Sequence, residues 1–477
     1  MLFNSVEFLI FLPIVFGIYW FLLKKIRPQN ILVLVASYVF YGWWDWRFLS
    51  LIILSTFVDY TVGNYLGKTT QESKRKLLLW ISLLFNLGLL GTFKYFNFFI
   101  DNWIALWSTF GIEMNSISLN VILPVGISFY TFQTLSYTID IYKKQLKPTR
   151  DFFAFATFVA FFPQLVAGPI ERASNLLPQF FKPRKFNYAQ ATDGLRQILW
   201  GLFKKVVIAD NCAQYVNIIF ADHQDYSAST LAVGAVLFAF QIYGDFSGYS
   251  DIAIGVARLF GFELKQNFAF PYFSRDISEF WRRWHISLST WFRDYLYIPI
   301  GGSRVNDAKK LRNIFVIFVV SGFWHGANWT FIVWGALNAL FFLPLIFLKK
   351  NRVHLNVVAQ HRFLPNGKEI TQILFTFTLT TFAWIFFRAE NIEHAFDYIG
   401  GIFSASLLTI PEFNFTEITI LLIFFLVIEW IGRREQYGIE KSLNKIHYTL
   451  RWSFYLLLLL TIFTFGKDSN EFIYFQF

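Results

Sequence analysis

The stretch NIFVIFVVSGFWHGANWTFIVWGALNALFFLPLIF, residues 313–347, decides the class of this protein. It contains no Asp, Glu, Lys or Arg. As one continuous helix it would extend ~52 Å at ~1.5 Å per residue, well beyond the ~30 Å hydrocarbon core of a bilayer. We therefore expect the helix to break at Gly322 and Gly326. His325 lies next to that expected break, far from either flanking loop.

Other apolar runs approach the ~20 residues that a membrane-spanning helix needs. They are residues 8–23, 77–93, 114–139 and 370–387, with shorter runs at 31–44, 418–428 and 452–465. The chain is 55% hydrophobic and only 15% charged, whereas a soluble domain carries roughly 25% charged residues. These features predict an all-α polytopic membrane protein. Because no linker, low-complexity segment or repeat divides the chain, we expect residues 1–477 to form a single membrane domain.

The distribution of cations predicts the orientation of the chain. Basic residues gather in the loops 24–27, 68–76 and 143–150 and in the stretch 433–451. Because basic loops remain in the cytoplasm, both termini are expected outside it. The same bias accounts for the formal net charge of +11, so we do not expect nucleic-acid binding. The first apolar run has no preceding Lys or Arg and is expected to stay in the mature protein.

Polarity concentrates in the middle of the chain. Residues 161–179 read FFPQLVAGPIERASNLLPQ, in which proline and glycine interrupt any helix, and this pattern predicts a re-entrant turn. Residues 243–255, YGDFSGYSDIAIG, place Asp245 and Asp251 in an otherwise uncharged run, so both carboxylates need partners. Irregular backbone at membrane depth survives only inside protein or around a water-filled cavity. We therefore expect the functional site in this central region.

A third polar stretch, residues 275–304, reads RDISEFWRRWHISLSTWFRDYLYIPIGGSR. Asp276 followed by Glu279 is typical of a helix start, so residues 277–298 are expected to be mostly helical, with Glu279 and Arg283 paired at i, i+4. One largely aromatic face is expected from Trp281, Trp284, Leu288, Trp291 and Tyr295. Such a helix lines a cavity or lies at an interface, and a membrane-surface helix is the alternative.

These motifs resemble one family. The segments FWRRWHISLSTWFRDYLYIPIGGSR (280–304) and GFWHGANWTFIVWG (322–335) are similar to the membrane-bound O-acyltransferase (MBOAT) family. The closer likeness is to its bacterial branch, which acetylates exported alginate or peptidoglycan, and the D-alanylation protein of teichoic acids is a more distant relative. The opening MLFNSVEFLIFLPIVFGIYW, the motif YGWWDWRF and the ending EFIYFQF also resemble that branch.

The resemblance implies a fold and a setting. The fold is a ring of roughly ten to twelve membrane helices with re-entrant segments around a thin centre. A cytoplasmic funnel for the acyl donor faces an extracytoplasmic funnel. No bound cofactor is implied, and the donor substrate is an acyl-CoA, most simply acetyl-CoA. The location is the inner membrane of a bacterium. An extracytoplasmic, esterase-like acetyltransferase partner and an exported polysaccharide are the further partners implied.

The resemblance also assigns residues. The catalytic histidine of the family falls on His325, and a second motif histidine falls on His285. A neutral imidazole suits a general base because the ordinary pKa of histidine is ~6.5, although transfer through an acyl-histidine is an alternative. His285, Trp324 and Asn328 are candidates to orient the imidazole or to stabilise an oxyanion, so Trp324 and Asn328 are expected at the substrate. No metal site is expected, and the single cysteine, Cys212, excludes a cysteine-cluster site.

Several interpretations stay open. The cations Arg304, Lys309, Lys310 and Arg312 suit either the phosphates of coenzyme A or ordinary positive-inside bias, and we assign them to no site. A transporter would also bury Asp245, Asp251 and His325 along a path, although the chain lacks repeats. A structural subunit of a polymer-export complex is a further alternative. The aromatic tail, residues 470–477, is expected to cover the outer mouth or dock a partner, or else to act as an interfacial anchor.

Overall fold

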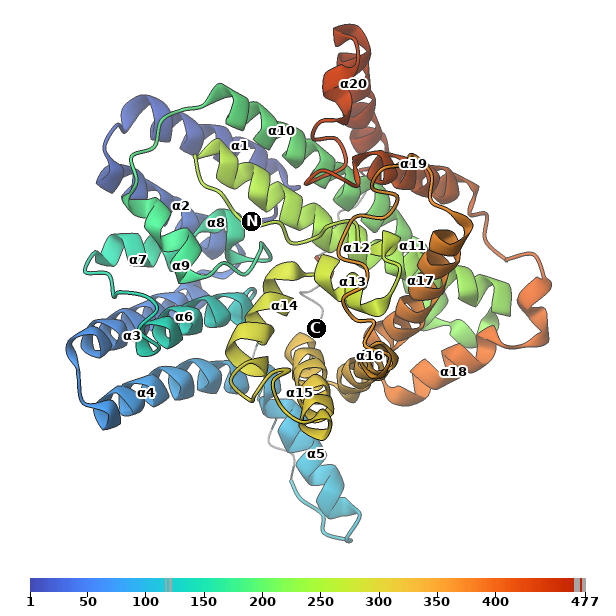
Figure 1. Cartoon of the computed structure of the whole chain (residues 1–477), viewed down its shortest axis with the longest axis horizontal. Coiled ribbons are helices and arrows are strands. Elements are labelled where there is room, and N and C mark those ends of the chain that lie inside the picture. The colour runs from blue at the N-terminus through green and yellow to red at the C-terminus, as the bar shows by residue number, and fades with distance from the viewer. Residues whose placement is uncertain (116–117, 120–121, 467–471, 474–477) are drawn as a thin grey trace. The chain divides into compact units, whose positions relative to one another are not determined.

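The computed structural model describes residues 1–115, 118–119, 122–466 and 472–473 (Figure 1). The secondary structure of these residues is helical, with turns and no strand. Six of the described helical segments are long and apolar enough to cross a membrane: Ile26–Lys68, Glu72–Ser108, Ala228–Leu259, Trp329–Phe347, Gly367–Arg388 and Tyr448–Phe465. The prediction of an all-α polytopic membrane protein is confirmed. The predicted ring around a central funnel stays a prediction.

The described residues form two compact units. Unit 1 comprises Met1–Ala191 with Ala257–Leu264, and unit 2 comprises Thr192–Val256 with Lys265–Phe477. Both boundaries near residues 191 and 256 fall inside helices, α10 and α12, rather than in linkers. The prediction of one domain over residues 1–477 stays a prediction.

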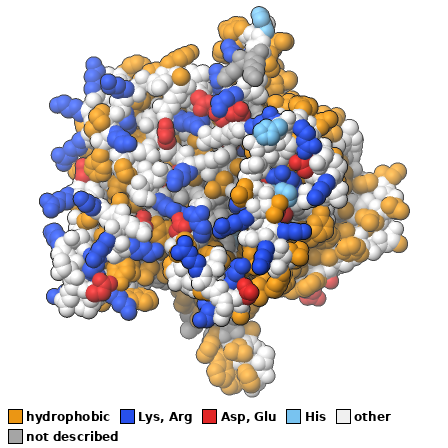
Figure 2. Space-filling view, in the orientation of Figure 1, with side chains coloured by type: hydrophobic (Ala, Val, Ile, Leu, Met, Phe, Trp, Pro, Cys, Tyr) orange, Lys and Arg blue, Asp and Glu red, His pale blue; other side chains and the backbone are white. Residues whose placement is uncertain are grey.

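Unit 1 contains the N-terminal helices. They are α1 (Val6–Gly17), η1 (Ile18–Leu22), α2 (Ile26–Asp45), η2 (Trp46–Phe48), α3 (Leu49–Lys68), α4 (Glu72–Leu90), η3 (Gly91–Tyr95), α5 (Phe96–Ser108), α6 (Ile127–Tyr142), α7 (Phe152–Val159), α8 (Phe162–Leu165), α9 (Ala173–Leu176) and η4 (Leu177–Phe181). Figure 2 shows apolar side chains over α5, where Phe99, Trp103 and Leu106 are exposed. Apolar exposure of this kind suits contact with lipid.

Two expectations about unit 1 have different outcomes. The apolar run at 114–139 is not one helix, and that prediction is wrong: α6 begins only at Ile127. Pro124 has no backbone N–H to continue a helix, and Gly126 adopts a left-handed φ of 75° as the N-cap. The predicted interruption within residues 161–179 is confirmed, because only the short helices α8, α9 and η4 form there. That this segment re-enters the membrane stays a prediction.

Unit 2 contains the remaining helices, apart from the ends of α10 and α12. They are α10 (Tyr188–Leu202), η5 (Phe203–Ala209), α11 (Asp210–Ala221), η6 (His223–Asp225), α12 (Ala228–Leu259), η7 (Pro271–Phe273), α13 (Ile277–Arg283), α14 (Ile286–Phe292), η8 (Arg293–Tyr297), α15 (Asp307–His325), α16 (Trp329–Phe347), α17 (Gly367–Arg388), α18 (Ile392–Ile402), η9 (Ala405–Leu408), α19 (Thr416–Gly432), η10 (Ser442–Lys445) and α20 (Tyr448–Phe465).

Helices α15 and α16 form a tight antiparallel hairpin (Figure 1). The break expected in residues 313–347 is confirmed at Gly326, which is extended after α15 ends at His325, but not at Gly322, which lies inside α15. A Cβ atom at Gly326 would lie 2.0 Å from the ring of Phe331, and one at Gly322 would lie 2.2 Å from the Phe331 carbonyl oxygen. Both glycines are therefore needed because the two helices approach each other closely. The hairpin places His325 at its tip.

The segment 277–298 is helical but not one straight helix. Asp276 caps α13, its carboxylate accepting the Glu279 N–H, and Glu279 pairs with Arg283 at 2.9 Å. Both of those predictions are confirmed. The expectation of one aromatic face along the whole segment is wrong, because His285 adopts a left-handed φ of 43° between α13 and α14. This turn redirects the chain, so that α13 and α14 do not share one face.

The buried carboxylates of α12 have cationic partners. The Asp245 carboxylate lies 2.9 Å from Lys205 Nζ, and the Asp251 carboxylate lies 2.5 Å from Lys204 Nζ. Both lysines come from η5, a π-helical stretch of unit 2. The expectation that these aspartates need partners is confirmed. Lys205 also lies 2.9 Å from the Asp210 carboxylate, so Asp245 and Asp210 share one cation. Both aspartates of α12 thus belong to buried ion pairs.

Candidate active site

His325 occupies a buried aromatic pocket at the tip of the α15–α16 hairpin. Its ring centroid lies 4.9 Å from that of Trp324, 5.2 Å from Trp334 and 5.3 Å from Phe387. Trp334 is on α16 and Phe387 on α17, so three helices surround the imidazole. Only 3% of the His325 surface is exposed. The imidazole is therefore enclosed by apolar aromatic rings.

His285 is held by a hydrogen-bond network built around Asn267. The Oδ1 atom of Asn267 lies 3.1 Å from Nδ1 of His285 and also accepts the backbone N–H and the hydroxyl of Ser287. The amide nitrogen of Asn267 donates to the Ser250 hydroxyl on α12 at 3.0 Å. The donors around Asn267 Oδ1 fix the amide orientation, so Nδ1 of His285 is the protonated nitrogen. Nε2 is therefore the nitrogen with a free lone pair.

Burial keeps the His285 ring uncharged. It lies outside the six candidate membrane spans and has 1% of its surface exposed. Desolvation lowers the pKa of His285 to about 3. Among the described residues, its Nε2 atom has no hydrogen-bond partner. A buried nitrogen of this kind is costly to leave unsatisfied, which is a feature of functional sites.

Trp324 lies between the two histidines. Its ring centroid is 4.9 Å from that of His325 and 6.2 Å from that of His285. The sequence prediction of a site containing His325, His285 and Trp324 corresponds to one continuous cluster in the structure. The roles assigned to these three residues stay predictions.

Asn328 occupies a different position. Its Oδ1 atom accepts the Thr330 N–H as the N-cap of α16, and its amide nitrogen donates to the Glu390 carbonyl at 2.7 Å. Both ends of the amide are thus engaged in holding the start of α16 and the loop after α17. This position supports the hairpin that carries His325. A direct contact of Asn328 with substrate stays a prediction.

A cavity of about 470 Å³ is lined by side chains of α15 as far as Ser321, and His325 is not among the described residues that line it. Its inner wall includes Trp281 and Ser321, and its rim includes Lys310 and Arg352. Ser321 precedes His325 by one helical turn on α15, and the Trp281 ring lies 5.7 Å from Trp334, which contacts His325. The volume is in the range of small-molecule sites. Of the cations left unassigned from the sequence, Lys310 lines this cavity.

Two residues of the C-terminal tail lie beside the second histidine. The predicted tail, residues 470–477, lies outside the described residues except for Phe472 and Ile473. Phe472 packs 4.9 Å from the Tyr249 ring and 5.9 Å from the Phe246 ring, and Phe246 lies 4.6 Å from His285. The backbone N–H of Ile473 donates to the Asp245 carboxylate at 2.7 Å.

Three residues of the described networks were not predicted from the sequence: Asn267, Lys204 and Lys205. The two lysines show the same sequence pattern as the aspartates, a charged residue within an apolar run. They interrupt the stretch WGLFKKVVIA at residues 200–209. Asn267 had a weaker signal, as an amide that follows Gln266 and precedes the apolar residues FAFPYF at 268–273. Neither signal identifies a partner, since the contacting residues are distant in sequence.

Comparisons with known proteins identify the family of this chain. Residues 31–389 match MBOAT, the membrane-bound O-acyltransferase family. The chain is 38% identical to the probable alginate O-acetylase AlgI of Pseudomonas putida, over 100% of both chains. It is 37% identical to the peptidoglycan O-acetyltransferase of Helicobacter pylori, covering 84% of this chain and 80% of the relative. A teichoic acid D-alanyltransferase of Bacillus subtilis is 28% identical over 58% of this chain and 71% of the relative. The chain therefore belongs to the membrane-bound O-acyltransferase family and is an acyltransferase.

Proposed function

We propose that this protein transfers an acetyl group from cytoplasmic acetyl-CoA, or another acyl-CoA, to a hydroxyl outside the cytoplasm, with His325 as the general base. The acceptor is an exported polysaccharide or a relay partner with an esterase-like fold. The protein would act in the inner membrane of a bacterium, with both termini extracytoplasmic. The observation that carries the proposal is the burial of His325 at the tip of the α15–α16 hairpin, where its ring packs on Trp324, which also contacts His285. Ser321, one helical turn before His325, lines a cavity.

The cavity supports the donor side of the proposal. Its wall contains the apolar side chains of Ile314, Ile317, Phe318 and Phe342, and its rim has the cations Lys310 and Arg352. An acyl-CoA has two parts that match this wall and these cations: a weakly polar thioester arm and a nucleotide end that carries phosphates. Phosphates would stay at the cationic rim while the thioester reaches Ser321, one turn from His325.

The chemistry follows from a neutral imidazole in an apolar setting. The acceptor oxygen attacks the thioester carbonyl carbon while His325 takes the hydroxyl proton. The C–S bond then breaks, the new ester C–O bond is complete, and the imidazolium returns its proton to the departing thiolate. Exclusion of water protects the thioester from hydrolysis. In this proposal Trp324 packs against both imidazoles and positions them, and Asn328 holds the tip of the hairpin.

His285 has a supporting role in this proposal. Its Nδ1–H is held by Asn267, so its Nε2 accepts a hydrogen bond and can orient the acceptor hydroxyl. The left-handed backbone at His285 costs of order 1–3 kcal/mol, a strain that clusters at active sites. His285 would therefore position the reacting group while His325 moves the proton.

Partner chemistry comes from the relatives. Their names include an alginate O-acetylase and a peptidoglycan O-acetyltransferase, both acting on hydroxyls of glycans. A glycan acceptor outside the cytoplasm is therefore the proposed substrate class. A relay protein would take the acyl group from this chain and pass it to the polymer.

Substitution of His325 tests the proposal. His325→Gln should reduce acetyl transfer by ~10²–10⁴-fold, because an amide forms hydrogen bonds but is not a base at neutral pH. The measurement is acetyl-CoA turnover by purified protein with its acceptor present. His361→Gln, at an exposed histidine in the α16–α17 loop, is the matched control. Near wild-type transfer by folded His325→Gln protein would show that His325 is not the base.

A further inference from the structure

A second cavity, of about 770 Å³, lies between α16 and α17. Its walls are apolar side chains from the two helices: Leu340, Phe341, Pro344 and Leu345 from α16, and Phe375 and Leu379 from α17. Leu340 and Phe375 are exposed. Both helices are candidate membrane spans, so the medium that contacts these exposed walls is lipid. We call this cavity the α16–α17 groove.

The length of the α16–α17 groove fits one acyl chain. It extends along α17 from Lys368 to Leu379. At ~1.5 Å per residue this is ~16 Å, about half of the ~30 Å hydrocarbon core. The groove therefore spans about one leaflet of a bilayer.

Charge gathers at one end of the groove. Lys350, after the end of α16, and Lys368, in the first turn of α17, both line it. Among the described residues, no carboxylate lies within ion-pairing distance of either ammonium group. Figure 2 shows Lys and Arg side chains on the viewed face in the region of α13, α16 and α17. An anion at this end would meet two cations that have no internal counter-charge.

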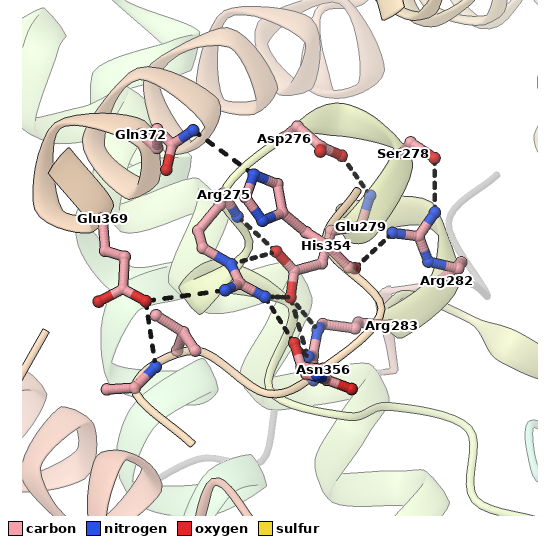
Figure 3. A network of polar contacts seen from close by, with 12 residues as sticks. Arg275, Asp276, Ser278, Glu279, Arg282, Arg283, His354, Asn356, Glu369 and Gln372 are labelled. Atoms are coloured by element: carbon pink, nitrogen blue, oxygen red, sulfur yellow. Dashed lines mark hydrogen bonds and ion pairs between the residues drawn. The ribbon is translucent and has the colours of Figure 1, made fainter. Parts of the chain in front are cut away.

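Nearby carboxylates are already engaged, as Figure 3 shows. Glu279 pairs with Arg275 at 3.0 Å and with Arg283 at 2.9 Å. Glu369 pairs with Arg362 at 2.9 Å, and Asp276 accepts the Glu279 N–H. Asp276 also lines the groove, but among the described residues it forms no ion pair with Lys350 or Lys368. The cationic end of the α16–α17 groove is thus open to an external anion.

The same network holds the loop between α16 and α17 against α13. Arg282 donates to the carbonyls of Asn351 and His354, and Arg275 donates to the carbonyl of Asn356. These hydrogen bonds therefore hold the loop that carries Lys350 in a fixed position. A fixed cation at the end of an apolar channel is preorganised for binding.

We propose that the α16–α17 groove binds one anionic phospholipid, with the phosphate at Lys350 and Lys368 and an acyl chain along the wall formed by α16 and α17. The division of the groove into a cationic end and an apolar length of one leaflet matches the two parts of such a lipid. A zwitterionic lipid matches less well, because the same two lysines repel the cationic part of its head group. This groove is separate from the cavity lined by Ser321, and the proposal does not depend on the chemistry at His325.

Lipid binding to purified full-length protein tests the proposal. The delipidated protein is titrated with phosphatidylglycerol or phosphatidylcholine in detergent, and bound lipid is counted by native mass spectrometry. Wild type should retain one phosphatidylglycerol in preference to phosphatidylcholine. Each lysine near a membrane surface contributes about fivefold in affinity for an anionic lipid, so Lys350→Gln/Lys368→Gln should weaken binding by roughly 25-fold.

Two controls make the result specific. Lys24→Gln/Lys25→Gln removes the same charge at exposed residues that are not among those lining the groove and should leave retention unchanged. Glycerophosphoglycerol, which has the head group without acyl chains, should not be retained. Equal retention of both phospholipids, equal retention by wild type and Lys350→Gln/Lys368→Gln, equal loss in the Lys24/Lys25 control, or tight binding of glycerophosphoglycerol would each overturn the proposal.

Discussion

Asn267 connects His285 to α12: its Oδ1 atom lies 3.1 Å from His285 Nδ1, and its amide nitrogen donates to Ser250 at 3.0 Å. A single side chain thus fixes which nitrogen of the imidazole carries the proton and where the ring points. The backbone of Asn267 adds a further tie, because its carbonyl accepts the Ile286 N–H at 2.8 Å. The position of His285 is therefore determined by residues outside its own helix.

The first prediction concerns this connection. Asn267→Ala removes the acceptor of the His285 Nδ1–H, so the ring can turn and exchange tautomers. A buried hydrogen bond of this kind is worth ~1–3 kcal/mol, or about 5- to 150-fold. We expect kcat for acetyl transfer to fall within that range while KM for the donor changes little. A variant with wild-type kcat would show that Asn267 does not position His285.

The second prediction is a pH dependence of stability. The pKa of His285 is lowered to about 3 in the folded protein, whereas an unfolded chain has the ordinary value of ~6.5. The unfolded state therefore binds the proton first as pH falls, and stability is lost between pH ~6.5 and ~3. From pH 7.5 to pH 5, wild type should lose about 2 kcal/mol more than His285→Gln.

Unfolding in detergent at several pH values measures this difference. The comparison is between wild type and His285→Gln, because the glutamine does not titrate. Parallel stability curves for the two proteins from pH 7.5 to pH 5 would show that His285 is not held neutral by burial.

The sequence predicted those parts of the fold that depend on local rules. The helix break at Gly326 followed from run length, and the start of α13 followed from Asp276 and Glu279. The turn at His285 did not follow, because a left-handed φ at a non-glycine residue is imposed by tertiary contacts. The span expected at 114–139 was wrong because an uncharged composition does not by itself favour helix, and α6 begins only at Ile127, after Pro124 and Gly126.

The site was predicted in part for the same reason. Motif resemblance located His325, His285 and Trp324, which the structure brings together. The partner of His285, Asn267, lies 18 residues earlier in sequence, and only a folded chain brings the two into contact. The pairing of Lys205 with Asp245 and of Lys204 with Asp251 could not be predicted from the sequence for the same reason. A carboxylate in an apolar run predicts a cationic partner but does not indicate which residue that partner is.

The third prediction concerns the buried ion pair of Lys204 and Asp251. Lys204→Met leaves the carboxylate without its cation, which costs ~3–5 kcal/mol for a buried pair. Replacing both partners with apolar residues, Lys204→Met/Asp251→Leu, should restore much of the lost stability. Unfolding in detergent measures both, with exposed Lys182→Met as the control. Wild-type stability of Lys204→Met would contradict a structural role for the pair.

The fourth prediction is topological. Ser73 and Ser108 are exposed near opposite ends of the candidate span Glu72–Ser108. The basic loop 68–76 should be cytoplasmic and the loop 101–113 outside. A membrane-impermeant maleimide should label Ser108→Cys on intact cells and label Ser73→Cys only after permeabilisation. The buried Cys212 gives little background. The opposite labelling pattern would reverse the orientation.

The last prediction concerns the tail. Phe472 is buried, with 1% of its surface exposed, between Tyr249 and Phe246 on α12. Truncating a buried phenylalanine costs ~3–5 kcal/mol of packing. Because Phe472 lies near the chain end, the loss should release the tail without unfolding the helices. Phe472→Ala should therefore insert into membranes normally yet lower polymer acetylation.

The matched control for the tail is Phe463→Ala, because Phe463 is an aromatic residue of α20 with 81% of its surface exposed. It should leave acetylation unchanged, since it contacts the surroundings rather than α12. Membrane content of each variant is measured beside acetylation, which separates insertion from activity. Phe246 touches both Phe472 and His285, so loss of the tail contact reaches the candidate active site through one ring. Full acetylation by Phe472→Ala would instead favour the alternative that the tail is only an interfacial anchor.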